Sequence, residues 1–303
     1  MDSLSRILSR IQVSSGLFCR AELGAPWSLH TRGGPHTIFH VIVRGSGLVE
    51  TADASVSFRA GDLIVLPGGP PHTMMDAPSS RPVPISSLPD HAGDDGLACV
   101  HHGGDGAQTS ILCGTFELAP DTRDFLLPLL PPILHVAGGA SATWLDQTLR
   151  MMAEEVSAAR PGHQVVLAKL ADLLLVQALR AAAAEGQGKG WLRALDDPQL
   201  GRVLGCIHAD PAAAWTAATL AREAGMSRAA FFERFRSVVG EPPAAYLVRW
   251  RMTLAREALR SGTAGLAEVA DEVGYSSEAA LSRAFKRHMG ISPGAWRRQA
   301  MVS

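Results

Sequence analysis

The spacing of hydrophobic positions changes part-way along this chain. Between about Cys19 and Leu118, short apolar runs such as TIFHVIVRG, DLIVLP and TSILCGTFEL alternate with Gly, Pro and other turn residues. Such runs are typical of antiparallel strands and predict a sandwich or a small barrel. From Trp144 onward, apolar residues recur three and four positions apart, which predicts helices. We therefore expect an α+β protein, with a β-barrel first and an all-α region at the end.

Two long helices are expected directly after the strands, at 143–159 and 163–182. Their apolar stripes are Leu145, Leu149, Met152 and Val156 on the first, and Leu170, Leu174 and Ala178 on the second. More of this surface is apolar than one barrel flank should need, although core packing alone could explain both stripes. The sequence EGQGKG that follows, at 185–190, has the composition of a short flexible linker.

The C-terminal part of the chain contains an internal repeat. At an offset of 50, Ser227 matches Ser277 and Phe235 matches Phe285, and just upstream, at an offset of 49, Gly225 matches Gly274. Each copy reads as a short helix, a glycine suited to a left-handed turn, a serine suited to an N-cap, and a second helix. This order predicts two helix-turn-helix units.

The second helix of each copy has an inward and an outward face. Phe231 and Phe235, or Leu281 and Phe285, lie four apart and must face inward. The predicted DNA-contacting positions are Arg228, Ala229, Phe232, Glu233 and Arg236 in the first copy, and Glu278, Ala279, Ser282, Arg283, Lys286 and Arg287 in the second. These faces are expected to enter the major groove of double-stranded DNA.

Arg283 is the strongest candidate for a base contact, because a guanidinium can donate twice to guanine. Arg236, Lys286 and Arg287 suit phosphate contacts. Glu233 would repel phosphate unless it accepts from a cytosine amine or pairs with Arg236 or Arg234. Those alternatives stay open.

The charge distribution agrees with a polyanion partner for the C-terminal part. The whole chain of 303 residues has a formal net charge of -1. From Gly201 onward there are 14 Lys and Arg against 9 Asp and Glu, a net +5, whereas the first 200 residues carry 14 against 20, a net -6. The basic part is the expected DNA binder.

Residues 196–303 resemble the DNA-binding domain of AraC-type regulators, notably in the stretch AEVADEVGYSSEAALSRAFKRHMGISPGAWRR. The resemblance implies a bipartite operator, contact with RNA polymerase, and base reading by the helix that carries Arg283. Ala229 is smaller than the contact residue expected at that point of the first unit, which leaves that unit's specificity open.

The segment GDLIVLPGGPPH has Gly61, Pro67, Gly69 and His72 at the spacing of the second cupin motif, which would place His72 on the inner wall of a barrel. His36 and His40, four apart on one expected strand, would share a face. His36, His40 and His72 are thus candidate ligands of a divalent metal, although the first cupin motif is not intact. A small effector in the barrel is equally compatible.

Residues 1–183 resemble the cupin-type sensory domain of one AraC-type branch, in FHVIVRGSG, GDLIVLPGGPPH, HHGGDGAQTSILCGTFEL and RPGHQVVLAKLADLLLVQALRA. That branch includes a regulator of reactive-chlorine resistance that uses two cysteines, and Cys19 and Cys113 occupy matching places. The resemblance implies an oxidant switch through this pair and a homodimer. Basic neighbours such as Arg20, or His101 and His102, would assist a reactive thiol. Cys99 and Cys206 look like core residues.

The expected organisation is a sensory and dimerisation domain at 1–183, a linker at 184–195 and the DNA-binding domain at 196–303. The N-terminus has helical spacing without a secretion signal, and no apolar run is long enough to span a bilayer. We therefore expect a cytoplasmic regulator without membrane association, and not an enzyme. The alternative is a metal-dependent cupin enzyme or a metal-responsive regulator that uses His72.

Overall fold

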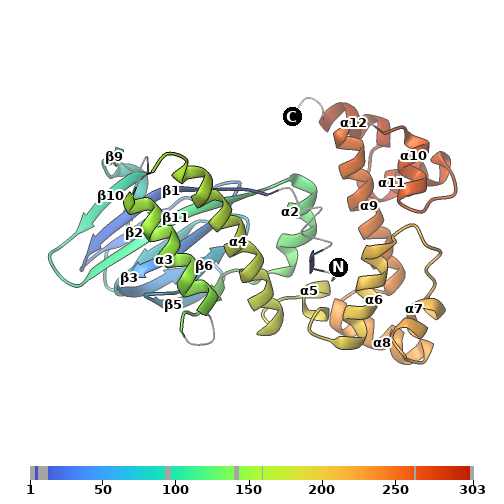
Figure 1. Cartoon of the computed structure of the whole chain (residues 1–303), viewed down its shortest axis with the longest axis horizontal. Coiled ribbons are helices and arrows are strands. Elements are labelled where there is room, and N and C mark those ends of the chain that lie inside the picture. Colours follow the sequence, from blue (N-terminus) through green and yellow to red (C-terminus); the bar gives the residue numbers. More distant parts are fainter. Residues whose placement is uncertain are drawn as a thin grey trace. The chain divides into compact units, whose positions relative to one another are not determined.

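The computed structural model describes residues 4–5, 13–92, 97–139, 143–158, 160–262 and 264–300. Its packing divides the chain into two compact units (Figure 1). The sheet unit consists of Gln12–Ala119 and Leu130–Gly188, and the helical unit combines Pro120–Leu129 and Lys189–Ser303 with the first eleven residues. The expected α+β class is confirmed.

The strands of the sheet unit form two sheets. The larger has the order β12-β6-β3-β11-β1-β10-β9 and the smaller the order β5-β4-β7-β2-β8; neighbours are antiparallel except β1 with β10 and β2 with β8. The strands are β1 (Val13–Gly24), β2 (Ser28–Thr31), β3 (Thr37–Arg44), β4 (Ser46–Glu50), β5 (Ser55–Arg59), β6 (Leu63–Leu66), β7 (His72–Met75), β8 (Val83–Pro84), β9 (Asp90–Ala92), β10 (Ala98–Gly103), β11 (Gln108–Leu118) and β12 (Leu134–Val136).

An apolar core fills the sheet unit. Every second residue of the central strands contributes to it, since successive side chains of a strand point to opposite faces. Ile38 and Ile42 of β3, Ile111 of β11 and Met74 of β7 belong to this core, together with the fully buried Trp27. His40 lies between Ile38 and Ile42 on the same strand face and is likewise buried, at 5% exposure.

Helices α3 (Thr143–Ala158) and α4 (His163–Ala184) pack against each other, and α4 also packs on β1 (Figure 1). The predicted stripes on both helices are buried within this one unit, as for Leu145, Met152 and Leu174. The apolar side chains that stay exposed lie on other positions of the same helices, namely Met151, Val165, Val166 and Leu173. The stripes are therefore core packing, and an interface between copies on these two helices would have to use the exposed positions.

The helical unit contains α2, α5–α12 and the short 3-10 turn η2, whereas the 3-10 turn η1 belongs to the sheet unit. Its helices are α2 (Pro120–Leu126), α5 (Gly190–Ala194), α6 (Pro198–Ala209), α7 (Ala217–Glu223), α8 (Arg228–Val239), α9 (Pro243–Ser261), α10 (Leu266–Glu272), α11 (Glu278–Met289) and α12 (Pro293–Ala300); the 3-10 turns are η1 (Ile85–Ser87) and η2 (Leu127–Leu129). The helical expectation for residues 4–11 lies, apart from Leu4 and Ser5, outside the described residues.

Packing assigns α2 to the helical unit, although its sequence lies within the expected sensory domain of residues 1–183. The functional boundaries at 183 and 196 remain predictions. In the described part of the chain, none of the helices combines the length and apolar character needed to cross a bilayer.

Candidate functional site

The two repeats fold as the sequence predicts at their turns. Ser227 accepts a hydrogen bond from the Ala230 amide at 3.3 Å, and Ser277 accepts one from Ala280 at 3.2 Å, so both serines are N-caps. The glycines that end the preceding helices, Gly225 and Gly274, have φ of +65° and +78°, in the left-handed region that side chains disfavour. Both helix-turn-helix units are confirmed at the level of local structure.

The predicted inward face of each second helix is fully buried: Phe231 and Phe235 on α8, and Leu281 and Phe285 on α11, each have 0% exposure. The predicted outward positions separate into two groups. Arg228, Ala229, Glu233, Arg236, Glu278, Ala279, Arg283, Lys286 and Arg287 are exposed, and Phe232 and Ser282 are half-buried. Exposure makes these side chains available to DNA, while their individual roles remain predictions.

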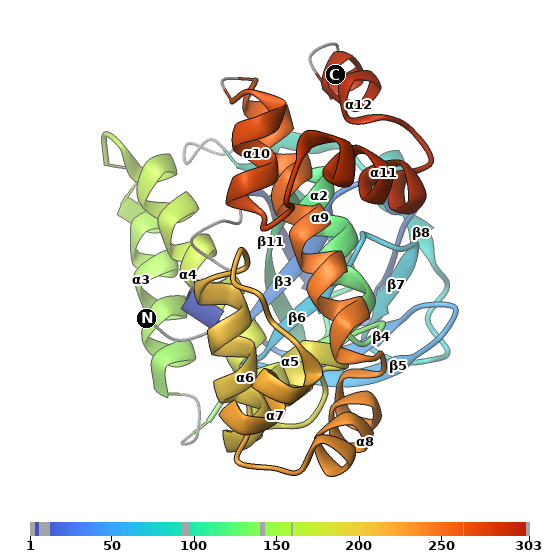
Figure 2. The same cartoon turned by 90° about the vertical axis from the view of Figure 1, so that its right-hand side faces the viewer.

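Helix α9 joins the two helix-turn-helix units, as Figure 2 shows. Its 19 residues correspond to a length of about 28 Å at 1.5 Å per residue. Trp250 and Leu254 are buried along it, and Tyr246 forms a buried hydrogen bond of 2.6 Å with His208 of α6. A continuous helix of this length with one buried face suits two helix-turn-helix units that face neighbouring major-groove segments.

Arg234 of α8 pairs with a carboxylate outside its own helix. Its guanidinium donates twice to the Asp197 carboxylate, at 2.9 and 2.7 Å. Burial alone would raise the pKa of Asp197, but the Leu200 amide, Arg234 and the Gln199 amide bring it below its ordinary value. Of the alternatives left open for Glu233, the pairing with Arg234 is disfavoured, because Arg234 joins α8 to the N-cap residue of α6, Asp197.

The sheet unit brings Cys19, Cys113 and His40 side by side on three adjacent strands. Cys19 of β1 is opposite Cys113 of β11, and Cys113 is opposite His40 of β3. A register shift between Leu17 and Cys19 sets this pairing. Both cysteines belong to the apolar core, with exposures of 4% and 6%. The resemblance implies an oxidant switch through Cys19 and Cys113, and the two residues are direct cross-strand neighbours.

His72, on β7 of the second sheet, extends this cluster. His72 Nδ1 lies 3.0 Å from the Pro70 carbonyl oxygen, His72 Nε2 lies 3.1 Å from His40 Nε2, and His40 Nδ1 lies 3.2 Å from Cys113 Sγ. Burial, and then the neighbouring His72, hold the pKa of His40 well below its ordinary value, and burial also lowers the pKa of His72. Both rings are therefore neutral near pH 7.

Neutral rings leave one consistent assignment of protons. A carbonyl only accepts, so His72 Nδ1 carries hydrogen and His72 Nε2 is the acceptor. His40 Nε2 then donates to His72, and the bare His40 Nδ1 accepts from the Cys113 thiol. The pKa of Cys113 lies well above its ordinary value because of its hydrogen bond with Cys19 and because burial disfavours the thiolate. Cys113 is thus a protonated thiol held by an imidazole.

These residues do not fit a metal site. The ring nitrogens of His40 and His72 are taken up by each other, by Cys113 and by Pro70. His36 precedes β3 and lies beside Glu117, 3.9 Å away, so the expectation that it shares a strand face with His40 is wrong. Within the described residues, no group of three or more His, Cys, Asp or Glu side chains is arranged to hold a metal ion.

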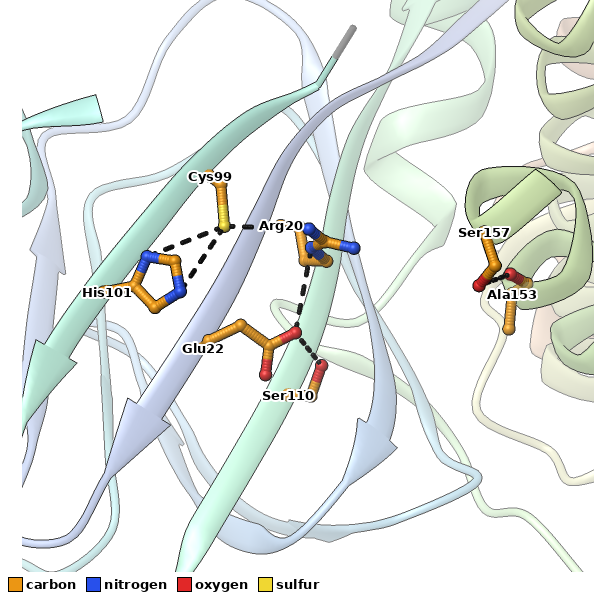
Figure 3. Close-up of polar contacts among 7 residues, drawn as sticks. All are labelled: Arg20, Glu22, Cys99, His101, Ser110, Ala153 and Ser157. Carbon is orange, nitrogen blue, oxygen red and sulfur yellow. Dashed lines mark hydrogen bonds and ion pairs between the residues drawn. The ribbon is translucent and has the colours of Figure 1, made fainter. Parts of the chain in front are cut away.

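Arg20 and His101 lie beside a different thiol from the one expected (Figure 3). Arg20 Nη2 is 4.0 Å from Cys99 Sγ, and the His101 ring nitrogens are 3.8 and 3.9 Å from it. The reason is the alternation of a strand: Cys19 and Arg20 are consecutive and point to opposite faces. The expectation that these basic residues assist Cys19 or Cys113 is not met.

Comparison with known proteins places both units in families. A cupin model matches residues 2–184, and a helix-turn-helix domain model matches residues 220–299. A putative AraC-like transcription regulator of Streptomyces lividans is 34% identical, over 98% of each chain. The chain belongs to the AraC family of transcription regulators.

Other AraC-family relatives also align over nearly the whole chain. The RCS-specific HTH-type transcriptional activator RclR of Escherichia coli is 28% identical, over 98% of this chain and 97% of its own. Among solved structures, the DNA-binding domain of AdpA in complex with a target DNA is 34% identical and covers 34% of this chain and 92% of its own, with a TM-score of 0.32. The protein is a DNA-binding AraC-family transcription regulator with an N-terminal cupin domain, and its relatives are regulators rather than enzymes.

Proposed function

We propose that this regulator binds a bipartite operator through α8 and α11, contacts RNA polymerase there, and changes its DNA binding when an oxidant joins Cys19 to Cys113. The observation that carries the proposal is the direct opposition of the two cysteines on β1 and β11. Opposed residues of an antiparallel pair have Cα atoms about 4.5 to 5.5 Å apart, within the usual range for a disulfide.

The environment of the pair favours a particular class of oxidant. Both thiols are buried in an apolar core, so a small uncharged molecule has the best access. The raised pKa of Cys113 keeps it a thiol, and weak electrophiles such as hydrogen peroxide react with thiolates. Hypochlorous acid is both small and strongly electrophilic, which agrees with the RCS-specific function named for the relative RclR.

The chemical step balances with hypochlorous acid as the oxidant. One thiol takes up chlorine as a sulfenyl chloride and releases water. The second thiol then displaces chloride from that sulfur and loses its proton, giving the disulfide, chloride and H⁺. When Cys113 is the second thiol, His40 Nδ1 is placed to receive the proton, at 3.2 Å from Sγ.

The test is operator binding by the purified, reduced full chain during titration with hypochlorous acid. The operator is the sequence enriched from random DNA by the reduced protein. We expect oxidation to change the affinity, and Cys19→Ser and Cys113→Ser each to abolish the change. Cys99→Ser is the matched control, because Cys99 is also buried but faces Arg20 and His101; it should respond like the unaltered protein.

Metal content is measured on the same samples. Identical binding by all four proteins across the titration would overturn the thiol proposal. A bound metal together with metal-dependent binding would instead support a metal-responsive regulator that uses His72.

We further propose that the protein is a homodimer through the exposed apolar positions of α3 and α4. Val165 is 66% exposed, Met151 53% and Leu173 42%, unusual values for large apolar side chains in helices that otherwise pack well. Val165→Glu with Leu173→Glu should shift the mass measured by light scattering from dimer to monomer. An unchanged mass would place the interface elsewhere.

A further inference from the structure

Helix α2 belongs by sequence to the sheet unit and by packing to the helical unit. It follows β11 after a single residue, Ala119, and the chain returns to the larger sheet at β12. Yet Pro120–Leu129 is packed within the helical unit. A segment between two strands of the sensory sheet is thus built into the DNA-binding part of the molecule.

The charged contacts of α2 converge on α9. The Asp121 carboxylate, 4% exposed, forms ion pairs with both Arg256 and Arg260. Asp124 adds a contact of 2.9 Å to Arg256. Arg256 is itself buried, at 8% exposure, so its charge is neutralised mainly by this short helix. A buried arginine without its carboxylate partner is strongly disfavoured, which makes α2 an integral part of the unit.

The apolar contacts of α2 reach the same helix. Phe125, 3% exposed, stacks on Trp191 of α5 with ring centroids 5.5 Å apart and lies 5.1 Å from the Trp250 ring of α9. The Arg249 guanidinium lies 4.8 Å above the Phe125 ring. Just after α2, the Leu129 carbonyl accepts from the Lys189 amide at 2.8 Å. Residues from Asp121 to Leu129 therefore contact other parts of the helical unit.

Helix α9 is the element that fixes one helix-turn-helix unit relative to the other, and β11 is the strand that carries Cys113. We propose that α2 is the coupling element between sensing and DNA binding: a change in β11 is carried through Ala119 and α2 to Asp121, and from there to Arg256 and Arg260 of α9. The proposal goes beyond the proposed thiol switch, because it holds for any signal that alters β11.

Coupling of this kind is reciprocal, so DNA binding must act back on β11. This allows a test that needs no inducer: amide hydrogen exchange of the full chain, with and without the operator enriched from random DNA. We expect operator to slow exchange on α8 and α11, where it binds, and also on α2 and β11, by about fivefold or more at coupled amides.

Asp121→Asn keeps the shape of the side chain and removes its charge. It should leave the slowing on α8 and α11 intact while the slowing on β11 falls towards onefold. Asp124→Asn is the matched control on the same helix, because the Asp124 side chain is 54% exposed and should add little. If Asp121→Asn does not fold, Arg260→Gln removes one partner of Asp121 at a more exposed position, with 26% side-chain exposure, and should weaken the β11 response in the same direction.

Two results would overturn the proposal. In the first, the operator slows amide exchange on α8 and α11 but leaves exchange on α2 and β11 unchanged. The other is a β11 response of equal size in the unaltered protein, Asp121→Asn and Arg260→Gln. Protection of α8 and α11 in every protein verifies that DNA is bound, so neither result can be confused with a loss of DNA binding.

Discussion

The two helix-turn-helix units share a scaffold and differ on their surfaces. Each has a serine N-cap, a left-handed glycine and a fully buried pair of apolar residues in its second helix. At equivalent exposed positions the charges are reversed: Arg228 corresponds to Glu278, and Glu233 corresponds to Arg283. Similar helices with opposite charges at matching positions cannot favour the same bases, so we expect the two halves of the operator to differ in sequence.

The largest expected effect is on stability and comes from substituting the buried phenylalanine that the two helix-turn-helix units have in common. Phe235→Ala and Phe285→Ala each empty a fully buried position, and each should lower the free energy of unfolding by about 3 to 5 kcal/mol. The measurement is urea denaturation of the full chain, followed by helical circular dichroism. If only one substitution is costly, the two cores are not equivalent.

A smaller effect should come from the position where the charges are reversed. Arg283→Ala should weaken operator binding by about 1 to 3 kcal/mol and relax the preference at one base pair. Competition assays against operators altered one base pair at a time would measure this. Equal losses on operator and random DNA would make Arg283 a phosphate contact.

Glu233→Ala is the counterpart on α8 and separates two of the roles left open for Glu233, a base contact and repulsion of phosphate. A loss confined to the operator indicates that the carboxylate accepts from a cytosine amine. Tighter binding to all DNA indicates that it only repels phosphate.

The caps should have equal effects in the two units. Ser227→Ala and Ser277→Ala each remove one side-chain acceptor at a helix N-terminus and should cost about 1 kcal/mol of stability. Thermal unfolding of the two variants beside Ser237→Ala, a serine on α8 outside the caps, provides the comparison. A clear difference between the two cap variants would show that one turn is held by other contacts.

The smallest effect is expected at a phosphate contact. Arg287→Ala should reduce the slope of log K against log salt by about one and weaken all sequences alike. Binding titrations at several salt concentrations, on operator and on random DNA, give both quantities. A loss that appears only on the operator would assign Arg287 to base reading.

The repeat made the helical unit largely predictable. Matching serines, glycines and apolar pairs specify local structure, because a cap or a buried face depends on residues a few positions away. Helix α2 was not predictable in the same way. It has only seven residues, and the partners of Asp121, namely Arg256 and Arg260, are more than a hundred positions distant. The sequence around α2 therefore does not predict these ion pairs.

The thiol cluster was predictable only in part. The motif spacing gave His72, and the resemblance gave Cys19 and Cys113. That Cys113 contacts His40, and that Arg20 lies beside Cys99, follows from strand register. The register shift between Leu17 and Cys19 decides which residues of β1 face the core, and one position of slip would exchange them.

The chain re-enters the helical unit at Lys189, whose amide donates to the Leu129 carbonyl. This connection has a consequence for the design of chimaeras. The helical unit combines Pro120–Leu129 with Lys189–Ser303, so a cut after residue 188 separates α2 from the rest of the unit. A chimaera that exchanges only the region after residue 188 would leave Arg256 and Trp250 facing a foreign segment. Grafts that carry Pro120–Leu129 along with the C-terminal region should unfold at a higher temperature than fusions that lack this segment, because they keep the contacts of Asp121 and Phe125.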